Sequence, residues 1–200
     1  AGGFPVWSPD GSRIFFRRMI DIYQKASSGA GGAELFYAGE GRPSTPTGVS
    51  PDGRFLLFTQ MSGTTLEDVR VLPLEGNRQA VTLVGSPFSE SQAVFSPDGR
   101  WVAYASLESG RTEVYVRPFT TAGGVPALGG GKWQISKDGG SLPRWRGDGK
   151  EIVYRALVTG SPMAVDVDAS TSISVGVPKR LFVLTNNLPW VMAPDGQRFL

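Results

Sequence analysis

The residues best suited to binding chemistry lie together in the stretch PRWRGDGK. Arg144, Arg146 and Lys150 could contact a phosphate or a carboxylate, and the ring of Trp145 could stack on a cation. Trp145 also falls in an apolar column of the repeat described below, so we expect its ring in the core. Arg144 and Arg146 then lie on the opposite face of the same strand, where acidic groups of a neighbouring sheet can pair with them. The candidate binding residues are Arg144, Arg146 and Trp190.

Three other stretches approach known motifs without matching them. LGGGKW resembles a phosphate loop, but Pro126 stands where the leading glycine belongs and Trp133 replaces the serine or threonine. SKDGGSLPRW differs from the Asp-box turn of sialidases because Pro143 occupies the tryptophan position. Asp166 and Asp168 point to the same side of a strand, yet calcium takes about six to eight oxygen ligands. We expect a solvated strand end there, and we predict no metal and no cofactor.

The composition argues against the commonest catalytic centres. The chain has no histidine and no Gly-x-Ser-x-Gly stretch, so it carries neither a histidine-dependent triad nor the nucleophile elbow of α/β-hydrolases. It has no cysteine, which excludes disulfides, thiol nucleophiles and thiolate metal sites. The remaining catalytic route is a set of carboxylates placed by a cleft of the fold. We therefore predict that this chain is not an enzyme.

Charge and hydropathy limit the partners. Lys plus Arg (20) exceeds Asp plus Glu (18) by two, which is too small an excess to favour a nucleic-acid partner. No apolar run reaches the about eighteen residues of a membrane span, so we expect no membrane insertion by this segment. The expected partner is a protein or a small ligand.

A short turn motif that occurs five times must position these residues. Ser-Pro-Asp-Gly, or a variant of it, places aspartates 42, 46, 50 and 47 residues apart, a period typical of stacked repeats. Proline fixes one backbone angle of the turn, aspartate caps nearby amides, and glycine takes the left-handed conformation that closes a hairpin. We expect these residues to be structural turns and neither catalytic groups nor metal ligands. They are Asp10, Gly11, Asp52, Gly53, Asp98, Gly99, Asp148, Gly149, Asp195 and Gly196.

Apolar residues with a period of two flank each turn. They stand three positions before each aspartate and three positions after each glycine, as Phe95 and Val102 do. This alternation indicates two antiparallel strands joined by the turn. A third strand with an acidic start follows, as in DVRVLPL, and then a fourth, as in QAVTLV. The positions three residues before each aspartate form the first apolar column of the repeat. We expect its members Trp7, Phe95 and Trp145 to be largely buried.

Four antiparallel strands per repeat make the blade of a β-propeller, so the predicted fold class is all-β. Residues 1–200 form a single propeller domain or a fragment of one. Four complete blades and the start of a fifth leave blade edges open, so we expect a segment of a ring of six or more blades, whose edges could self-associate. The predicted blades span residues 4–40, 45–86, 91–137 and 141–185, with a partial blade at 188–200.

One predicted hairpin departs from the others. The stretch RRMI, residues 17–20, contains no glycine, proline or asparagine to make a tight turn. The interval from Asp10 to Asp21 is 11 residues, against 16 from Asp52 to Asp68. Either this hairpin is distorted, or loop residues are missing from the sequence.

The pattern apolar-Ser-Pro-Asp-Gly-Arg-apolar, followed by an Ile-Tyr or Val-Tyr strand, resembles the TolB-like or WD-repeat-like propellers of bacteria. Within that group, SPDGRWVAYASLESGRTEVYVRPF, GGKWQIS, PRWRGDGKEIVYRA and GVPKRLF are similar to the propeller that follows the kinase region of many receptor-like serine/threonine kinases. The resemblance implies a periplasmic or extracytoplasmic sensing or docking module. Two alternatives stay open, namely the accessory propeller of a prolyl-oligopeptidase-like hydrolase and a TolB-like periplasmic translocation partner.

Overall fold

The computed structural model describes residues 2–63, 66–76, 78–169, 173–183, 190–193 and 195–199. The chain is almost entirely β structure, which confirms the predicted fold class. Among the described residues the one helical segment is a 3₁₀ turn at Ala122–Gly124. This part of the chain contains no helix with the length and hydropathy of a membrane span.

The chain divides into two compact units. The first consists of Ala1–Ala93 with Thr121–Ala127, and the second of Val94–Thr120 with Leu128–Leu200. The boundary falls inside one strand, between Ala93 and Val94. Each unit is described by itself.

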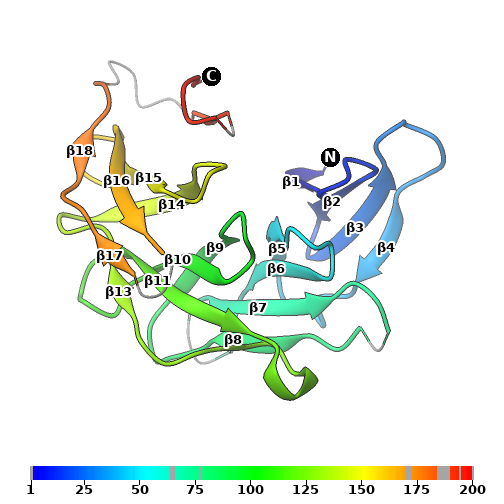
Figure 1. Cartoon of the computed structure of the whole chain (residues 1–200). Coiled ribbons are helices and arrows are strands. Elements are labelled where there is room, and N and C mark those ends of the chain that lie inside the picture. The colour runs from blue at the N-terminus through cyan, green and yellow to red at the C-terminus, as the bar shows by residue number, and fades with distance from the viewer. Residues whose placement is uncertain are drawn as a thin grey trace. The chain divides into compact units, whose positions relative to one another are not determined.

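The first unit holds two four-stranded antiparallel sheets whose strands lie in chain order (Figure 1). Consecutive strands pair because each connection is a short hairpin. The first sheet contains β1 (Gly3–Trp7), β2 (Arg13–Arg18), β3 (Asp21–Ala26) and β4 (Glu34–Tyr37). The second sheet contains β5 (Ser44–Val49), β6 (Phe55–Gln60), β7 (Asp68–Pro73) and β8 (Val81–Val84).

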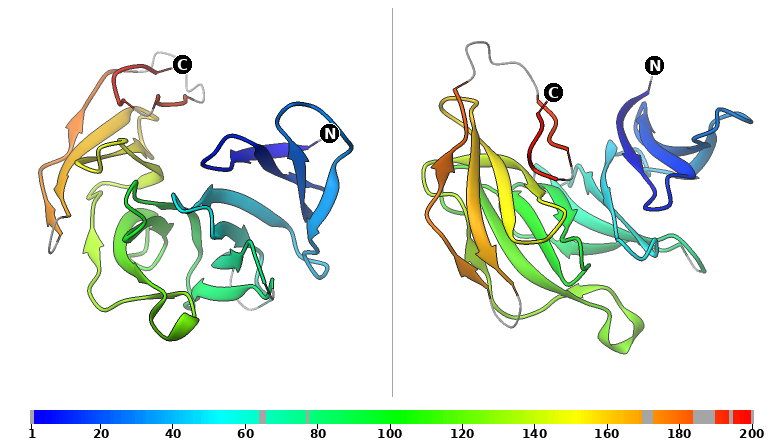
Figure 2. Two further views of the ribbon diagram at one scale, coloured as in Figure 1. Left: turned by 45° about the vertical axis from the view of Figure 1, so that its right-hand side comes forward. Right: turned by 45° about the horizontal axis from the view of Figure 1, so that its top comes forward.

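The other two sheets repeat this order, but their fourth strand is broken into two short pieces. Figure 2 shows β17 and β18 following one another along the edge of β16. The third sheet contains β9 (Glu90–Phe95), β10 (Trp101–Ser106), β11 (Glu113–Thr120), β12 (Ala127–Leu128) and β13 (Trp133–Gln134). The fourth contains β14 (Gly140–Trp145), β15 (Glu151–Ala156), β16 (Pro162–Asp168), β17 (Ser174–Val175) and β18 (Lys179–Arg180). An isolated bridge from Met192 to Phe199 marks the start of a fifth hairpin.

Each unit has its own apolar core between two sheets. In the first unit, Phe15 packs edge-on against Phe36 with ring centroids 5.0 Å apart, and both join Leu56 and Phe58 of the second sheet. In the second unit, side chains of β10 and β11 pack against those of β14, β15 and β16. The apolar columns predicted from the sequence supply both cores, since Leu56, Phe58 and Ile152 are all fully buried.

The predicted burial of the first column is right for Phe95 and Trp145 but wrong for Trp7. Phe95 and Trp145 are each 8% exposed, whereas Trp7 is 56% exposed. Trp7 pairs with Ile14, so both lie on the same face of the first sheet. The second sheet packs against the opposite face, through Phe15. No described sheet of the first unit covers Trp7, and its ring therefore remains open to solvent.

The hairpin at RRMI closes in a tight turn of two residues. Arg18 pairs directly with Asp21, so Met19 and Ile20 alone form the connection. Met19 has a φ of 57°, in the left-handed region that a residue with a branched or long side chain rarely adopts. The departure of this hairpin is therefore confined to its two-residue turn, and the paired strands keep a regular register.

The first strand of each sheet is also irregular, which the sequence did not predict. Phe4, Gln92 and Leu142 have positive φ values of 59°, 60° and 52°, and each lies six residues before the aspartate of its turn. The register shifts at Phe4 and Leu142, as it does beside Pro46 in the second sheet. Proline cannot adopt a positive φ, so the second sheet bulges by a different backbone path.

Candidate binding cavity at the Asp-Gly turns

The Ser-Pro-Asp-Gly hairpins are built by a serine that lies two residues before the aspartate. Ser96 Oγ donates to Asp98 Oδ1 over 2.6 Å and accepts from the backbone N of Trp101 over 3.0 Å. Gly99 has a φ of 72° and donates its N–H to Ser96 O over 2.9 Å. The Asp98 carboxylate also accepts from the backbone N of Arg100 over 3.0 Å and from its Nε over 2.6 Å. These bonds fix the turn, which supports the predicted structural role of its residues.

The same contacts keep the turn carboxylates ionised. Hydrogen bonds from Ser8 and then Ser12 lower the pKa of Asp10 to about 2. The pKa of Asp98 is also lowered, since the hydrogen bonds from Ser96 and Arg100 outweigh the opposing effect of burial. A carboxylate with so low a pKa is a poor general acid near neutral pH.

Arg146 takes the place of the serine in the fourth hairpin. Its Nε and a terminal nitrogen each donate to the Asp148 carboxylate over 2.9 Å, and its other terminal nitrogen donates to Glu151 over 3.1 Å. The hydrogen bond from Arg146 is the main reason that the pKa of Asp148 falls to about 2. The expectation that Arg146 pairs with a neighbouring sheet is therefore wrong, because its own hairpin supplies both acidic partners.

The other candidate binding residues make different contacts. Arg144 is exposed on β14 and donates from its guanidinium to the carbonyl of Pro143 over 2.9 Å. The ring of Trp190 packs edge-on against Phe199, with centroids 5.7 Å apart. A Cβ placed on Gly196, in the fifth turn, would lie 2.8 Å from Cδ of Arg146, so this turn packs closely over the arginine stem.

A cavity of about 380 Å³ lies between the third and fourth sheets, within the second unit. Its walls are the hairpin at residues 96–100, the hairpin at 147–150, and the end of β16 with the residue that follows it, 167–169. The indole N–H of Trp101 and the guanidinium of Arg100 each donate to Ala169 O over 3.3 Å. The indole N–H of Trp145 is buried and has no hydrogen-bond partner among the described residues.

The chemistry of this cavity favours binding. Its charged lining residues are Asp98, Arg100, Asp148, Lys150 and Asp168, so both signs of charge are present. Two of the carboxylates are held by arginines in their own hairpins. The described part of the chain has no group of three His, Cys, Asp or Glu side chains able to hold a metal ion. The cavity can therefore form hydrogen bonds and ion pairs with a polar ligand, and Trp101 and Trp145 also line it.

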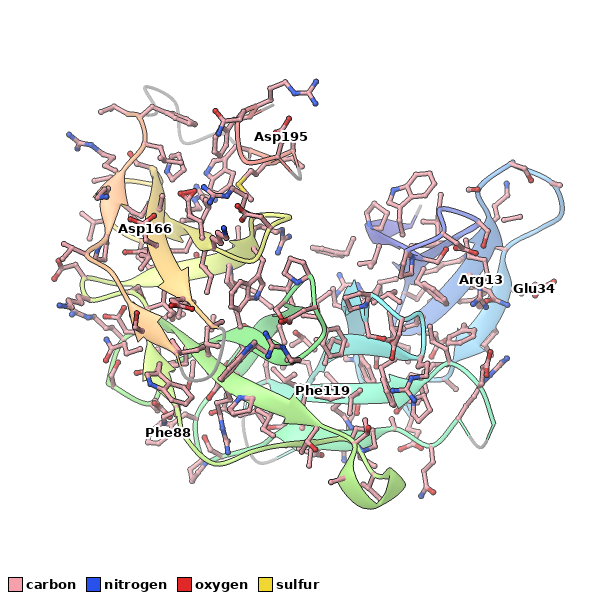
Figure 3. The ribbon with its side chains drawn as sticks, viewed as in Figure 1. Arg13, Glu34, Phe88, Phe119, Asp166 and Asp195 are labelled. Atoms are coloured by element: carbon pink, nitrogen blue, oxygen red, sulfur yellow. The ribbon has the colours of Figure 1, made fainter. Side chains whose placement is uncertain are left out.

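The weaker motifs have structural explanations. Figure 3 labels Asp166 on β16, where its carboxylate accepts from Lys179 Nζ over 3.2 Å across the strand pair. In LGGGKW, Lys132 Nζ lies 2.5 and 2.6 Å from the two carboxylate oxygens of Glu108. The lysine of the apparent phosphate loop therefore forms an ion pair with an acidic side chain.

The acidic residue that starts the third strand also has a defined role. Asp21 Oδ1 accepts from the backbone N of Gly39 over 2.8 Å. Glu113 is fully buried and accepts from Gly139 N over 3.1 Å, from Arg111 Nε over 2.6 Å and from the Ser136 hydroxyl. Each carboxylate therefore ties the loop that leaves the fourth strand back onto the third.

Comparison with known proteins gives similarity in structure only. No protein-family model matches the chain, and no curated protein matches it in sequence. TolB from Acinetobacter baumannii superposes with a TM-score of 0.72 at 21% identity, over 100% of this chain and 48% of that one. The putative TolB from Agrobacterium tumefaciens gives 0.72 at 20% identity, over 97% and 73%.

A third solved structure widens the range of functions found on this fold. The Pseudomonas aeruginosa periplasmic gluconolactonase PpgL gives a TM-score of 0.63 at 15% identity, over 98% of this chain and 63% of that one. The chain therefore spans about half of the A. baumannii protein and under two thirds of the gluconolactonase. Its four antiparallel sheets and these superpositions establish that the chain has the β-propeller fold of TolB-like proteins.

Proposed function

We propose that this chain is a non-catalytic β-propeller module that binds a protein or small ligand, as the extracytoplasmic part of a bacterial signalling protein such as a receptor-like serine/threonine kinase. The observation that carries the proposal is the cavity between two hydrogen-bonded Asp-Gly hairpins, whose wall carries charges of both signs.

Rigid turns around a concave site suit recognition, because little ordering is needed when a ligand binds. Lys150 lines the cavity, and no ion pair of its ammonium occurs among the described residues. Its ammonium group can therefore donate a hydrogen bond to an acceptor on a ligand. An extracytoplasmic location is supported by the structural likeness to a periplasmic protein, and the kinase context by the motifs of the sequence.

The test is to titrate the purified chain with small molecules. Binding is monitored through the indole N–H signals of its tryptophans in heteronuclear NMR spectra. Mixtures of small carboxylates, amides and sugars serve as probes. We expect at least one probe to shift the Trp145 and Trp101 signals in the native chain and to bind several-fold more weakly after Lys150→Glu. Lys25→Glu, in the first unit, is the matched control. The proposal of a binding site here fails if no probe shifts these signals.

The absence of catalysis needs its own measurement, since a gluconolactonase shares the fold. The chain should be incubated with a lactone, a chromogenic ester, a glycoside and a peptide. We expect no turnover above the buffer rate. Turnover that one Asp or Glu substitution abolishes would replace the binding module with an enzyme.

A TolB-like translocation partner is the second candidate function, favoured by the two TolB structures that superpose with this chain at a TM-score of 0.72. The two functions differ in what adjoins the propeller in the whole protein. A kinase region and a membrane span favour the signalling module, and their absence favours the TolB-like function.

A further inference from the structure

A second cavity, of about 460 Å³, lies in the second unit and shares no lining residue with the cavity at the Asp-Gly turns. It forms where the turn between β15 and β16 meets the loop at 137–139 and the segment that leads into β18. Apolar side chains make up much of its wall, including Ala156, Val158, Met163 and Val177. Val158 is 87% exposed, so an apolar residue stands open at the mouth.

The floor of this cavity is organised by three neighbouring strands. Tyr154 of β15 stands directly opposite Met163 of β16, and Met163 stands opposite Arg180 of β18. Residues directly opposite in antiparallel strands share one face, so these three form a row across the sheet. A Cβ on Gly140 would lie 2.8 Å from the Tyr154 ring, and glycine at this position therefore lets the chain pass close to the ring.

Tyr154 supplies a polar group at a largely apolar site. Its side chain is 3% exposed, yet its hydroxyl forms no hydrogen bond with any described residue. The hydroxyl is also not among the buried polar atoms that solvent cannot reach, so it opens into the cavity that Tyr154 lines. Burial, followed by the charges of Glu113 and Asp138, raises the pKa of Tyr154 to about 12. The hydroxyl therefore stays protonated and available as a donor at neutral pH.

The charges around the cavity are mixed, and the two that act on this hydroxyl are negative. Glu113 and Asp138 both place negative charge near it, as their effect on the tyrosine shows. Lys137 and Arg180 line the same cavity, and together they offset that negative charge over the cavity as a whole. An uncharged acceptor can approach the hydroxyl without repulsion from the carboxylates.

We propose that this cavity is a binding site for neutral carboxamides that carry an apolar side chain. The carbonyl oxygen accepts from the Tyr154 hydroxyl, and the side chain packs against Ala156, Val158 and Val177. Cavities of a few hundred Å³ with apolar walls and one or two placed polar groups are typical of small-ligand sites. Because this cavity is separate from the one at the Asp-Gly turns, the inference stands independently of the proposed function.

The experiment titrates the full chain with N-acetyl-L-leucinamide and follows its backbone amide signals by NMR. We expect shifts at Ala156, Val158 and Thr159. N-acetyl-L-leucinate has the same side chain with a carboxylate in place of the amide, and it should bind more weakly. Tyr154→Phe removes only the hydroxyl and should weaken binding of the amide about 2- to 10-fold, the range for one hydrogen bond.

Controls separate loss of binding from loss of fold. Tyr154→Phe should unfold at the same urea concentration as the native chain, because the hydroxyl bonds no described residue. Val158→Ser changes only an exposed side chain and should also weaken binding, whereas Tyr23→Phe, in the first unit, should leave it unchanged. The inference is overturned if the amide shifts no signal, if Tyr154→Phe binds it as tightly as the native chain, or if the carboxylate binds more tightly than the amide.

Discussion

Ser96 and Asp98 are joined by a 2.6 Å hydrogen bond from the serine hydroxyl to the carboxylate, and the same pairing links Ser8 to Asp10 over 2.6 Å and Ser50 to Asp52 over 2.5 Å. In each case the serine oxygen also accepts the backbone N–H of the residue that starts the return path of the hairpin. The serine thus holds both the aspartate and the returning strand.

Replacing Ser96 with alanine should lower the free energy of unfolding by about 1 to 2 kcal/mol, since it removes two hydrogen bonds and leaves the N–H of Trp101 without its acceptor. Urea unfolding measures the change. Ser28→Ala is the control, because Ser28 is exposed and holds only one long contact, to Ala30 N at 3.4 Å. Equal stability of the two variants would mean that the serine is dispensable.

Phe95→Ala should cost about 3 to 5 kcal/mol, the range for truncating a buried aromatic ring. The ring is 8% exposed and packs edge-on against Phe119, labelled in Figure 3, with centroids 5.0 Å apart. Trp7→Ala, in the same repeat position, should cost under about 1 kcal/mol, because Trp7 is mostly exposed. Thermal unfolding of both variants tests the pair, and a larger loss from Trp7→Ala would contradict the assigned packing.

Glu113→Gln should destabilise the chain by about 1 to 3 kcal/mol, since a buried carboxylate that accepts three hydrogen bonds becomes a neutral amide. Glu108→Gln is the matched control. It removes a partly exposed ion pair with Lys132, which is worth about 1 kcal/mol at most. Chemical denaturation of both variants measures the two losses of stability. Equal losses would refute the role of Glu113 in tying the loop to the third strand.

On the acid side of neutrality, stability should depend on pH through two turn carboxylates. The folded-state pKa values of Asp10 and Asp148 are about 2, against an ordinary value of 3.8. Between those values the unfolded chain binds more protons than the folded chain, so stability falls as the pH falls through this window and is fully retained above it. With no histidine, the free energy of unfolding should stay level from about pH 5 to 8.

The double variant Asp10→Asn, Asp148→Asn tests whether these two carboxylates cause the loss of stability in acid. Its unfolding midpoint should depend less on pH between about 2 and 4 than that of the native chain, because the two depressed carboxylates are gone. An unchanged pH profile would assign the acid sensitivity to other groups.

The repeat predicted the strands and turns well because both depend on local chemistry. Alternating apolar residues and an Asp-Gly core specify a hairpin whatever lies beside it, and the column at Leu56 and Ile152 reached the core as expected. Trp7 carries the same local signal, but its burial depends on which sheet lies over it. A column of residues in a sequence says which side chains share a face, and it does not say whether that face is covered.

The cavities were harder to predict because they arise from contacts between distant segments. Arg100 and Trp101 both bond Ala169 O, which lies far along the chain, and nothing in the local pattern marks this meeting. The partner of Arg146 could have been found, since Asp148 and Glu151 follow it closely in the same hairpin. The positive φ values at Phe4, Gln92 and Leu142 left no signal in the sequence, because none of these residues favours that conformation.

The short fourth strand of each sheet affects how the protein behaves at high concentration. The fourth strand has four residues in the first two sheets and is split into pieces of two residues in the others. Fibril growth needs an uninterrupted run of unpaired backbone groups on which an incoming segment can extend a ladder. Along these outer edges no described run is longer than four residues. The repeat therefore carries, in the interruption of its last strand, a barrier against templated aggregation.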